Sequence, residues 1–235
     1  MSLILCIETG TDICSVGLAR DGELVSLRES DEGRDHAKNV AVFVDELLRE
    51  NGVAAEELSA IAVGMGPGSY TGLRIGASIA KGICYGLNIS LIPVDTLQVL
   101  CACAQALAPE LLQPGALLCP MLDARRMEVY TALYEVQGDA ACLRLNDVQA
   151  LIIDQNAFAD QLSQRPVYFF GNGAEECKVV LSHPNAHFID NIKAQAKHMV
   201  PLAEMALARG LVEDVAYYTP FYLKEFVPGK SKSLL

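Results

Sequence analysis

Tryptophan is absent from the 235 residues, positive charge is scarce, and no hydrophobic run is long. The apolar stretches fall short of the roughly 18–20 residues that cross a bilayer, so the sequence predicts no membrane-spanning helix. Lysine and arginine number 18 against 29 aspartates and glutamates, which gives a net charge of −11. Phosphate contacts need a basic surface, and the few clustered lysines lie near the end of the chain. We therefore expect any nucleic acid that this chain serves to be held chiefly by a partner.

The Cys-x-x-Cys spacing of redox and zinc sites is also missing, although the chain has eight cysteines. They stand among apolar residues, which is typical of free, buried thiols in a reducing compartment. The first residues, MSLILCIETG, have no basic region ahead of their short apolar run, so they do not read as a signal peptide. These observations predict a cytoplasmic protein.

Apolar residues make up 51% of the chain, enough for a real core. Short apolar runs separated by turn residues predict three antiparallel strands, after which helices and strands alternate to about residue 108. The order β-β-β-α-β-α-β-α is that of the ribonuclease H-like lobe, two of which build actin-like ATPases. The expected elements are strands at Leu3–Ile7, Ile13–Ala19, Glu23–Glu29, Ile61–Val63 and Ile89–Ile92, and helices at Asp35–Asn51, Thr71–Leu87 and Thr96–Leu107.

The segment Pro109–Gly115 marks the expected boundary between two lobes, residues 1–108 and 109–235. The second lobe weakly repeats the pattern of the first, so we predict an α/β protein with the two-lobed fold of actin-like ATPases. A final helix, about residues 198–211, is placed so that it can pack back on the first lobe. The other expected elements are strands at Leu117–Leu122, Met127–Val136, Val167–Phe170 and Ala186–Ile189, and a helix after Gly171–Gly173.

The segment GMGPGSYTGLRIG, Gly64–Gly76, joins an expected strand to an expected helix, as phosphate-binding loops do. It is not a Walker A loop, because Leu73 stands where that motif needs lysine. The glycine spacing also differs from the dinucleotide-binding fingerprint, and Ser69 has no nucleophile-elbow pattern around it. We therefore assign no catalytic residue, no cofactor and no cofactor-binding residue, and we expect the loop to imitate a phosphate loop.

Histidine spacing does not predict a metal site either. His183 and His187 form His-x-x-x-His, but the Pro-Asn pair between them opposes the helix that would bring both imidazoles to one face. His36 starts a predicted helix, yet the residue four positions on is Val40, which cannot bind metal. We predict no metal ligands.

The predicted helix Thr71–Leu87 carries only two charges, Arg74 and Lys81, and four glycines, each of which costs about 1 kcal/mol relative to alanine. Its isoleucines form a ridge between two rows of small residues at four-residue spacing. One row is Gly72, Gly76 and Ala80, and the other is Ser78, Gly82 and Gly86. Small residues let a second element approach closely, either within the domain or from another subunit.

With the neighbouring helix Asp35–Asn51, this helix would form a two-helix surface that completes a four-helix bundle with a partner. The subunit alternative therefore predicts an interface on these two helices. The predicted interface residues are His36, Val40, Phe43, Gly72, Arg74, Ile75, Gly76, Ile79, Ala80 and Ile83.

Four segments together resemble the bacterial TsaB family, also called YeaZ. They are LCIETGTDICSVGLARDG near the start, GMGPGSYTGLRIG, DARRMEVY at Asp123–Tyr130 and PFYLKE at Pro220–Glu225. They occur in the family's order over nearly the whole chain, and GPGSYTGLRIG is highly specific. The resemblance implies the two-lobed actin-like (ASKHA) fold with a degenerate nucleotide site. It also implies a non-catalytic subunit of the machinery that makes tRNA threonylcarbamoyladenosine.

The same resemblance implies partners. The family binds a catalytic paralogue, TsaD, through the two helices of the first lobe, and a small ATPase, TsaE, joins them. TsaD carries a helical metal-binding histidine pair and transfers threonylcarbamoyl to N6 of the adenosine beside the anticodon in tRNAs reading codons that begin with A. In isolation the family forms homodimers through the same helices, and tRNA is reached only through the complex. His36 lies near where the first metal histidine of TsaD falls, and Val40 replaces the second.

Two other functions remain open. The segment Ile7–Thr11 resembles the first phosphate loop of actin-like ATPases, with Glu8 in place of the aspartate that holds magnesium-bound water. An actin-like ATPase or kinase-type enzyme acting alone would bind ATP saturably and lose that binding on Glu8→Ala. A metallopeptidase, a label attached to the wider family, would carry metal at stoichiometric level.

Overall fold

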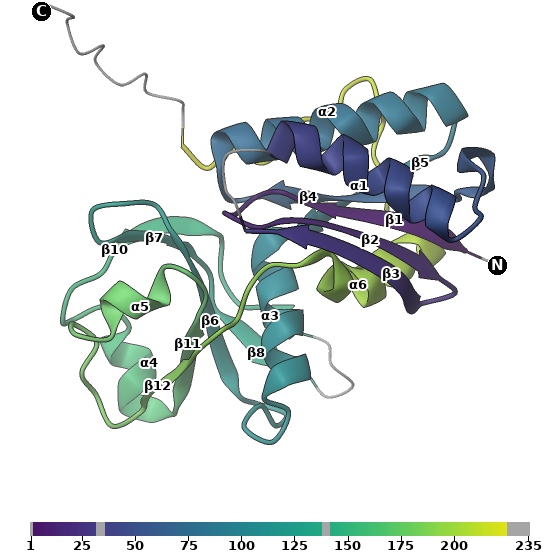
Figure 1. Ribbon diagram of the computed structural model, residues 1–235. Coiled ribbons are helices and arrows are strands. Elements are labelled where there is room, and N and C mark those ends of the chain that lie inside the picture. Colours follow the sequence, from purple (N-terminus) through teal and green to yellow (C-terminus); the bar gives the residue numbers. More distant parts are fainter. Residues whose placement is uncertain (1, 32–35, 138–141, 225–235) are drawn as a thin grey trace, which may run out of the picture.

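The computed structural model describes residues 2–31, 36–137 and 142–224, and these residues form two sheets with helices around them (Figure 1). The first sheet has five strands in the order β3-β2-β1-β4-β5. A meander of three antiparallel strands is followed by two strands parallel to β1, as the sequence predicted. The strands are β1 (Leu3–Glu8), β2 (Cys14–Arg20), β3 (Glu23–Ser30), β4 (Ala60–Gly66) and β5 (Ser90–Asp95).

Helices cover both faces of this first sheet (Figure 1). Two of them, α1 (His36–Glu50) and α2 (Tyr70–Leu87), lie side by side on one face, while α6 (Ala196–Ala208) packs against the other. Strand β1 is buried on both sides: Leu5 belongs to the core under α1 and α2, and Ile4 belongs to the core shared with α3 (Thr96–Leu107) and α6. A short helix, Ala55–Glu57, connects α1 to β4. The expected start of the first helix at Asp35 lies outside the described residues.

The second sheet is built around β6 (Leu117–Asp123), with strand order β10-β7-β6-β11-β12. Of two further strands, β8 pairs with β6 and β9 pairs with β8. The parallel pairs β6–β11 and β11–β12 form one part, and antiparallel strands form the other. The remaining elements are β7 (Glu128–Thr131), β8 (Tyr134–Val136), β9 (Cys142–Arg144), β10 (Gln149–Ile152), α4 (Ala159–Gln164), β11 (Val167–Phe170), α5 (Ala174–Cys177) and β12 (Ala186–Ile189).

The prediction of one long strand over Met127–Val136 is wrong, because β7 and β8 are separate. The break lies opposite Pro120 in the middle of β6, and proline has no N–H to donate to a neighbouring strand. The Thr131 hydroxyl donates a 2.8 Å hydrogen bond to the carbonyl oxygen of Pro120, and pairing with β6 resumes at Tyr134. Pro120 in β6 therefore interrupts the pairing of the neighbouring segment, which divides into β7 and β8.

The last helix begins at Ala196 and ends at Ala208, a little earlier than expected, and Gly210 with a positive φ of 67° follows it. Although α6 comes late in the sequence, it packs on β1 and β2 of the first sheet. One continuous apolar core joins α6 and α3 to residues of the second sheet such as Tyr134 and Phe170. We propose that the chain divides into its two lobes near residue 108.

Residues 211–224, here named the C-terminal strap, run back along the first sheet beside α2 (Figure 1). The N–H of Glu213 donates to the carbonyl oxygen of Leu91 at the edge strand β5, at 2.9 Å. Further along, the N–H of Phe221 donates to the carbonyl oxygen of Met65 at the end of β4, at 2.8 Å. Within the described part of the chain, no helix is both long and apolar enough to cross a membrane.

Candidate functional site

The glycine loop Gly64–Gly76 packs directly on the loop that follows β1. The N–H of Ser69 donates to the carbonyl oxygen of Gly10 at 2.7 Å, and the Thr9 hydroxyl donates to the carbonyl oxygen of Gly72 at 2.8 Å. A Cβ on Gly68 would overlap the carbonyl oxygen of Gly10, and one on Gly72 would overlap that of Thr9. Glycine at these two positions therefore allows the backbones of the two loops to lie in direct contact.

Ser69 caps α2, its hydroxyl accepting a 3.2 Å hydrogen bond from the N–H of Gly72. Two amides at the start of α2, those of Ser69 and Gly72, are thus engaged within the chain. A phosphate loop needs such amides free to face its ligand. The N–H groups of Ser69 and Gly72 are therefore not available to such a ligand.

Glu8, the residue at the magnesium position of actin-like ATPases, is turned inward. Its side chain is completely buried, and its Oε1 accepts a 2.7 Å hydrogen bond from the N–H of Gly10. A Cβ on Gly64 would lie 2.6 Å from its Oε2, so a glycine is needed there to make room for the carboxyl group. Burial raises the pKa of Glu8 to about 7. Glu8 is not among the residues that line the cleft in front of the glycine loop.

The histidines that sequence spacing singled out have structural partners. His36 is buried at the start of α1, and its Nε2 lies 2.9 Å from the carbonyl oxygen of Thr11, which joins the helix to the loop after β1. His183 accepts a hydrogen bond from the N–H of Asn185, whereas His187 stacks on Tyr168 in the second sheet. Among the described residues, no three side chains of the histidine, cysteine, aspartate and glutamate types converge as metal ligands would.

The inner face of α2 holds several of the predicted interface residues, and this corrects part of the prediction. Gly72, Gly76 and Ala80 are buried against the chain's own sheet. A Cβ on Gly76 would overlap the Thr9 hydroxyl and would lie 3.4 Å from Val63. This row of small residues therefore brings α2 close to β1 and β4, and it does not face a partner.

The inner face of α1 requires the same correction. His36 and Val40 are buried in the monomer, and Val40 belongs to the core between the helices and the sheet. Phe43 is partly buried against that core. His36 and Val40 therefore stabilise the packing of α1 on its own domain. Of these three residues, only Phe43 keeps part of its side chain accessible.

The second row of small residues on α2 points outward. Ser78, Gly82 and Gly86 are exposed, and a Cβ on Gly82 or Gly86 would meet no atom within 4 Å. Arg74 is exposed on the same side, and its Nη1 donates a 3.0 Å hydrogen bond to the hydroxyl of Tyr70. The open row is thus the one that a partner helix could approach.

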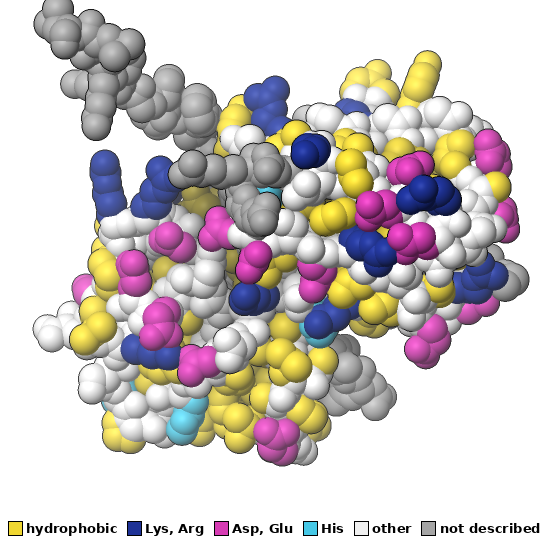
Figure 2. All heavy atoms as spheres, viewed as in Figure 1, with side chains coloured by type: hydrophobic (Ala, Val, Ile, Leu, Met, Phe, Trp, Pro, Cys, Tyr) yellow, Lys and Arg dark blue, Asp and Glu magenta, His cyan; other side chains and the backbone are white. Residues whose placement is uncertain are grey.

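The isoleucine ridge of α2 lies between this open row and α1. Ile75, Ile79 and Ile83 are partly buried and pack against the core under the two helices. On α1, Ala41 and Val42 are exposed, Val42 with 43% of its surface accessible. Figure 2 shows apolar side chains among charged ones over these helices. We call this surface the outer helix face, comprising Ala41, Val42, Arg74, Ile75, Ser78, Ile79, Gly82 and Ile83.

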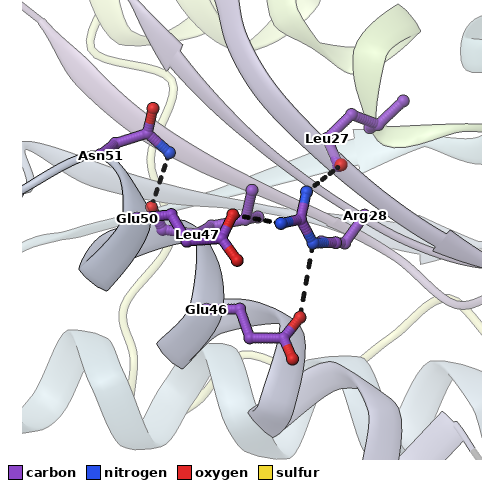
Figure 3. Close-up of polar contacts among 6 residues, drawn as sticks. All are labelled: Leu27, Arg28, Glu46, Leu47, Glu50 and Asn51. Carbon is purple, nitrogen blue, oxygen red and sulfur yellow. Dashed lines mark hydrogen bonds and ion pairs between the residues drawn. The ribbon is translucent and has the colours of Figure 1, made fainter.

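The far end of α1 is fixed to the first sheet by Arg28 on β3 (Figure 3). The guanidinium pairs with Glu46 at 3.4 Å and with Glu50, and it also donates to the carbonyl oxygen of Leu27 at 3.1 Å. Ion pairs of this kind are screened by solvent and contribute little to stability. Their effect is geometric, because they hold α1 beside the sheet from the end opposite His36.

A cleft of about 400 Å³ lies between the two lobes, in front of the glycine loop. From the first lobe it is lined by Asp12 and Ser69, and from the second by Asp123, Arg125 and Asn172. The backbone from Arg125 to Met127 has positive φ throughout, at 59–70°. The cleft combines acidic and basic side chains with hydroxyl groups.

Comparison with known proteins supports the family that the residues suggest. The family model for the TsaD family, tRNA N6-adenosine threonylcarbamoyltransferase, matches residues 30–227. The tRNA threonylcarbamoyladenosine biosynthesis protein TsaB of Escherichia coli (strain K12) is 36% identical over 97% of this chain and 96% of its own length. TsaB of Haemophilus influenzae is 39% identical over 54% of this chain and 51% of its own length.

A solved structure, described as YeaZ from Pseudomonas aeruginosa, has a TM-score of 0.79 at 26% identity. The matched region spans 95% of this chain and the full length of the YeaZ chain. The two-lobed α/β fold of the actin-like class is thereby confirmed. Within that class, the chain belongs to the TsaB (YeaZ) family.

Proposed function

We propose that this chain is a non-catalytic scaffold and activating subunit in the biosynthesis of tRNA threonylcarbamoyladenosine. In this role it binds the catalytic paralogue TsaD, with the ATPase TsaE joining them, and tRNA is reached only through the complex. The complex transfers threonylcarbamoyl to N6 of the adenosine next to the anticodon in tRNAs reading codons that begin with A. The names of the curated relatives, which state threonylcarbamoyladenosine biosynthesis, support the process.

The outer helix face is the single observation that carries the role of a binding subunit. Gly82 and Gly86 leave the surface of α2 open, and the isoleucine ridge beside them is only partly buried. A second pair of helices could approach closely there and bury the ridge, which is how four-helix bundles are built. The same face would serve a homodimer when TsaD is absent, so the two assemblies would compete.

The glycine loop and Glu8 support the non-catalytic part of the proposal. Glu8 is buried beneath Gly10 and Gly64, and the loop amides of Ser69 and Gly72 bind within the chain. An actin-like nucleotide site would need both elements to face the cleft. Their packing gives the loop a structural role, because it sets the position of α2 and hence of the outer helix face.

Reconstitution tests this function. Purified TsaD, TsaE, tRNA, threonylcarbamoyl-AMP and ATP are mixed with and without this protein, and modified tRNA is counted. We expect modification to require this chain and the chain alone to modify nothing. Equal modification without it would overturn the activating role, and modification by the chain alone would overturn the non-catalytic one.

A second candidate is an actin-like ATPase or kinase-type enzyme that acts alone. The cleft in front of the glycine loop favours it, because Ser69, Arg125 and Asn172 line a space of about 400 Å³ between the lobes. Titration of the isolated chain with ATP tests this alternative. Saturable binding and turnover that are lost in Arg125→Ala would support it, whereas the scaffold role predicts no turnover.

A further inference from the structure

A cavity of about 400 Å³ lies between α3 and α6, and it shares no lining residue with the cleft in front of the glycine loop. The residues of α3 that line it have the spacing of one helix face: Gln98, Cys101, Ala102, Gln105 and Ala106. Cys142, at the start of β9, lines the cavity as well. Two thiols from segments far apart in the sequence therefore border the same space.

Two polar contacts fix the register of β9 beside α3. Nη1 of Arg144 lies 3.5 Å from Oδ2 of Asp95, the residue that caps the start of α3. The Cys142 thiol donates a 3.2 Å hydrogen bond to Oε1 of Gln105, nearer the end of the helix. Cys101 lies between Asp95 and Gln105 along α3, one turn before Gln105 and on the same face. This register places the thiols of Cys101 and Cys142 beside each other.

The two thiols differ in accessibility and in acidity. Cys101 is 1% exposed in the core shared by α3 and α6, whereas Cys142 is only partly buried against that core. A hydrogen bond with the Cys101 thiol lowers the pKa of Cys142, although burial opposes this effect. Burial and then the hydrogen bond with Cys142 raise the pKa of Cys101. Because the thiolate is the nucleophile, Cys142 is the member of the pair that reacts first.

The other side chains of the cavity favour a thiolate at Cys142. Lys197 on α6 supplies a positive charge, and no acidic side chain is among the described residues that line the cavity. His198 beside it is neutral at pH 7, since burial and then the charge of Lys197 lower its pKa to about 4. Rotation of the Gln105 amide presents an N–H group to the sulfur once the thiol has lost its proton.

We propose that Cys101 and Cys142 form a dithiol redox site, which a small-molecule disulfide converts reversibly into a disulfide bond between α3 and β9. The Cys142 thiolate attacks one sulfur of the small disulfide, and the other sulfur leaves as a thiolate. The Cys101 sulfur then attacks that of Cys142, and its proton passes to the second small thiol as this leaves. The two protein thiols lose two electrons and two protons, and the small disulfide gains both to become two thiols.

The bond would join the two sheets of the protein. Helix α3 follows β5 of the first sheet directly, whereas β9 pairs with β8, which pairs with β6 of the second sheet. A cross-link between residues some 40 positions apart restricts the unfolded chain and so stabilises the folded one. A reducing compartment keeps such a pair as thiols until an oxidant accumulates, so the site would respond to the redox state around it.

Oxidation of the full-length chain in buffers of oxidised and reduced glutathione tests the site. Remaining thiols are blocked with N-ethylmaleimide, and the peptides are mapped by mass spectrometry. We expect two of the eight thiols to be lost to one internal bond, Cys101–Cys142, which dithiothreitol reverses. The oxidised chain should melt about 5 °C or more above the reduced chain. This measurement needs no variant.

Single substitutions separate the two roles. Cys101→Ala should stop at a glutathione adduct on Cys142, and Cys142→Ala should form neither the adduct nor the bond. Cys103→Ala is the matched control, since Cys103 is buried on α3 but does not line the cavity, and it should keep the Cys101–Cys142 bond.

Three results would overturn the dithiol site. The first is an unmodified chain that keeps all eight thiols in the most oxidising buffer. The second is a glutathione adduct that persists on Cys142 while Cys101 stays reduced, or a bond between another pair. The third is loss of the bond in Cys103→Ala, because its formation would then follow from general packing of α3 and not from this cavity.

Discussion

The hydroxyl of Thr9 donates a 2.8 Å hydrogen bond to the carbonyl oxygen of Gly72, which fixes the loop after β1 to the first turn of α2. The carbonyl oxygen of Thr9 occupies the space that a side chain on Gly72 would need. The position of α2, and with it the outer helix face, therefore depends on backbone contact at this point.

Paired glycine substitutions on α2 should have opposite effects. Gly72→Ala forces the helix away from Thr9 and should lower the free energy of unfolding by about 1–3 kcal/mol, as overpacking does. Gly82→Ala meets no atom within 4 Å and should raise it by about 0.5–1 kcal/mol through helix propensity. Urea denaturation followed by circular dichroism measures both. Equal effects of the two substitutions would contradict the assignment of inner and outer faces.

Binding of TsaD should be sensitive to Ser78→Arg. Ser78 lies in the open row of the outer helix face, so a long charged side chain should hold the partner helices apart and weaken binding at least about tenfold, or 1.4 kcal/mol. Isothermal titration with purified TsaD measures this, and size-exclusion chromatography with light scattering follows the homodimer.

The matched control for Ser78→Arg is Ser163→Arg on α4, an exposed serine of the second lobe. It should leave binding and the melting temperature unchanged. Normal TsaD binding by Ser78→Arg would place the interface elsewhere on the chain.

The free energy of unfolding should depend on pH through Glu8. Its pKa in the folded chain is about 7, above the ordinary value of 4.5, so the folded state binds the proton more tightly than the unfolded state does. Stability from this group is therefore full below about pH 4.5, falls as the pH rises to about 7, and is constant above that. One pKa unit corresponds to about 1.4 kcal/mol, so the loss is about 3 kcal/mol at most.

Glu8→Gln removes this dependence while its amide oxygen still accepts the hydrogen bond from Gly10. The difference in stability between Glu8→Gln and the unmodified chain, measured by urea denaturation from pH 5 to pH 8, should shift in favour of the variant as the pH rises. A difference that stays constant over this range would mean that Glu8 does not titrate there.

Lys81→Met should loosen the C-terminal strap. The ammonium group donates to the carbonyl oxygens of Ala216 and Tyr218, at 3.3 Å and 2.9 Å, and methionine keeps the length of the side chain without these bonds. We expect faster cleavage within the strap by a limiting amount of protease and a loss of about 1 kcal/mol in stability. Lys38→Met, at an exposed position on α1, is the control and should be cleaved at the original rate.

Much of the first sheet could be predicted because its signals are local. The apolar run at Leu3–Ile7 indicates a central strand, and the Asp21–Gly22 turn indicates a hairpin. The region from β9 to α4 was missed because its strands are short and half exposed, so they lack a clear period. The break between β7 and β8 depends on Pro120 in another strand, and a residue that acts across a sheet leaves no sign in the neighbouring sequence.

The candidate site shows the same limit. Both rows of small residues on α2 have the spacing that close packing needs, and spacing alone does not say which row faces inward. The contact of Gly72 and Gly76 with Thr9, some 60 residues earlier, decides it. Within the helix sequence, only the polar residue Ser78 in the second row indicated which row is exposed. The inward turn of Glu8 likewise depends on the space left by Gly64, which only the fold brings to it.

The strap and α6 have a consequence for how the protein is made. The ribosome delivers β1, β2 and the first helices long before residues 196–218, yet Met199 and Tyr218 belong to the cores on the two faces of that first sheet. The nascent first lobe thus emerges with apolar surface on both faces uncovered. Its core closes only after residues 196–218 have been translated, so this lobe depends on a segment more than 100 residues further along the chain to complete its fold.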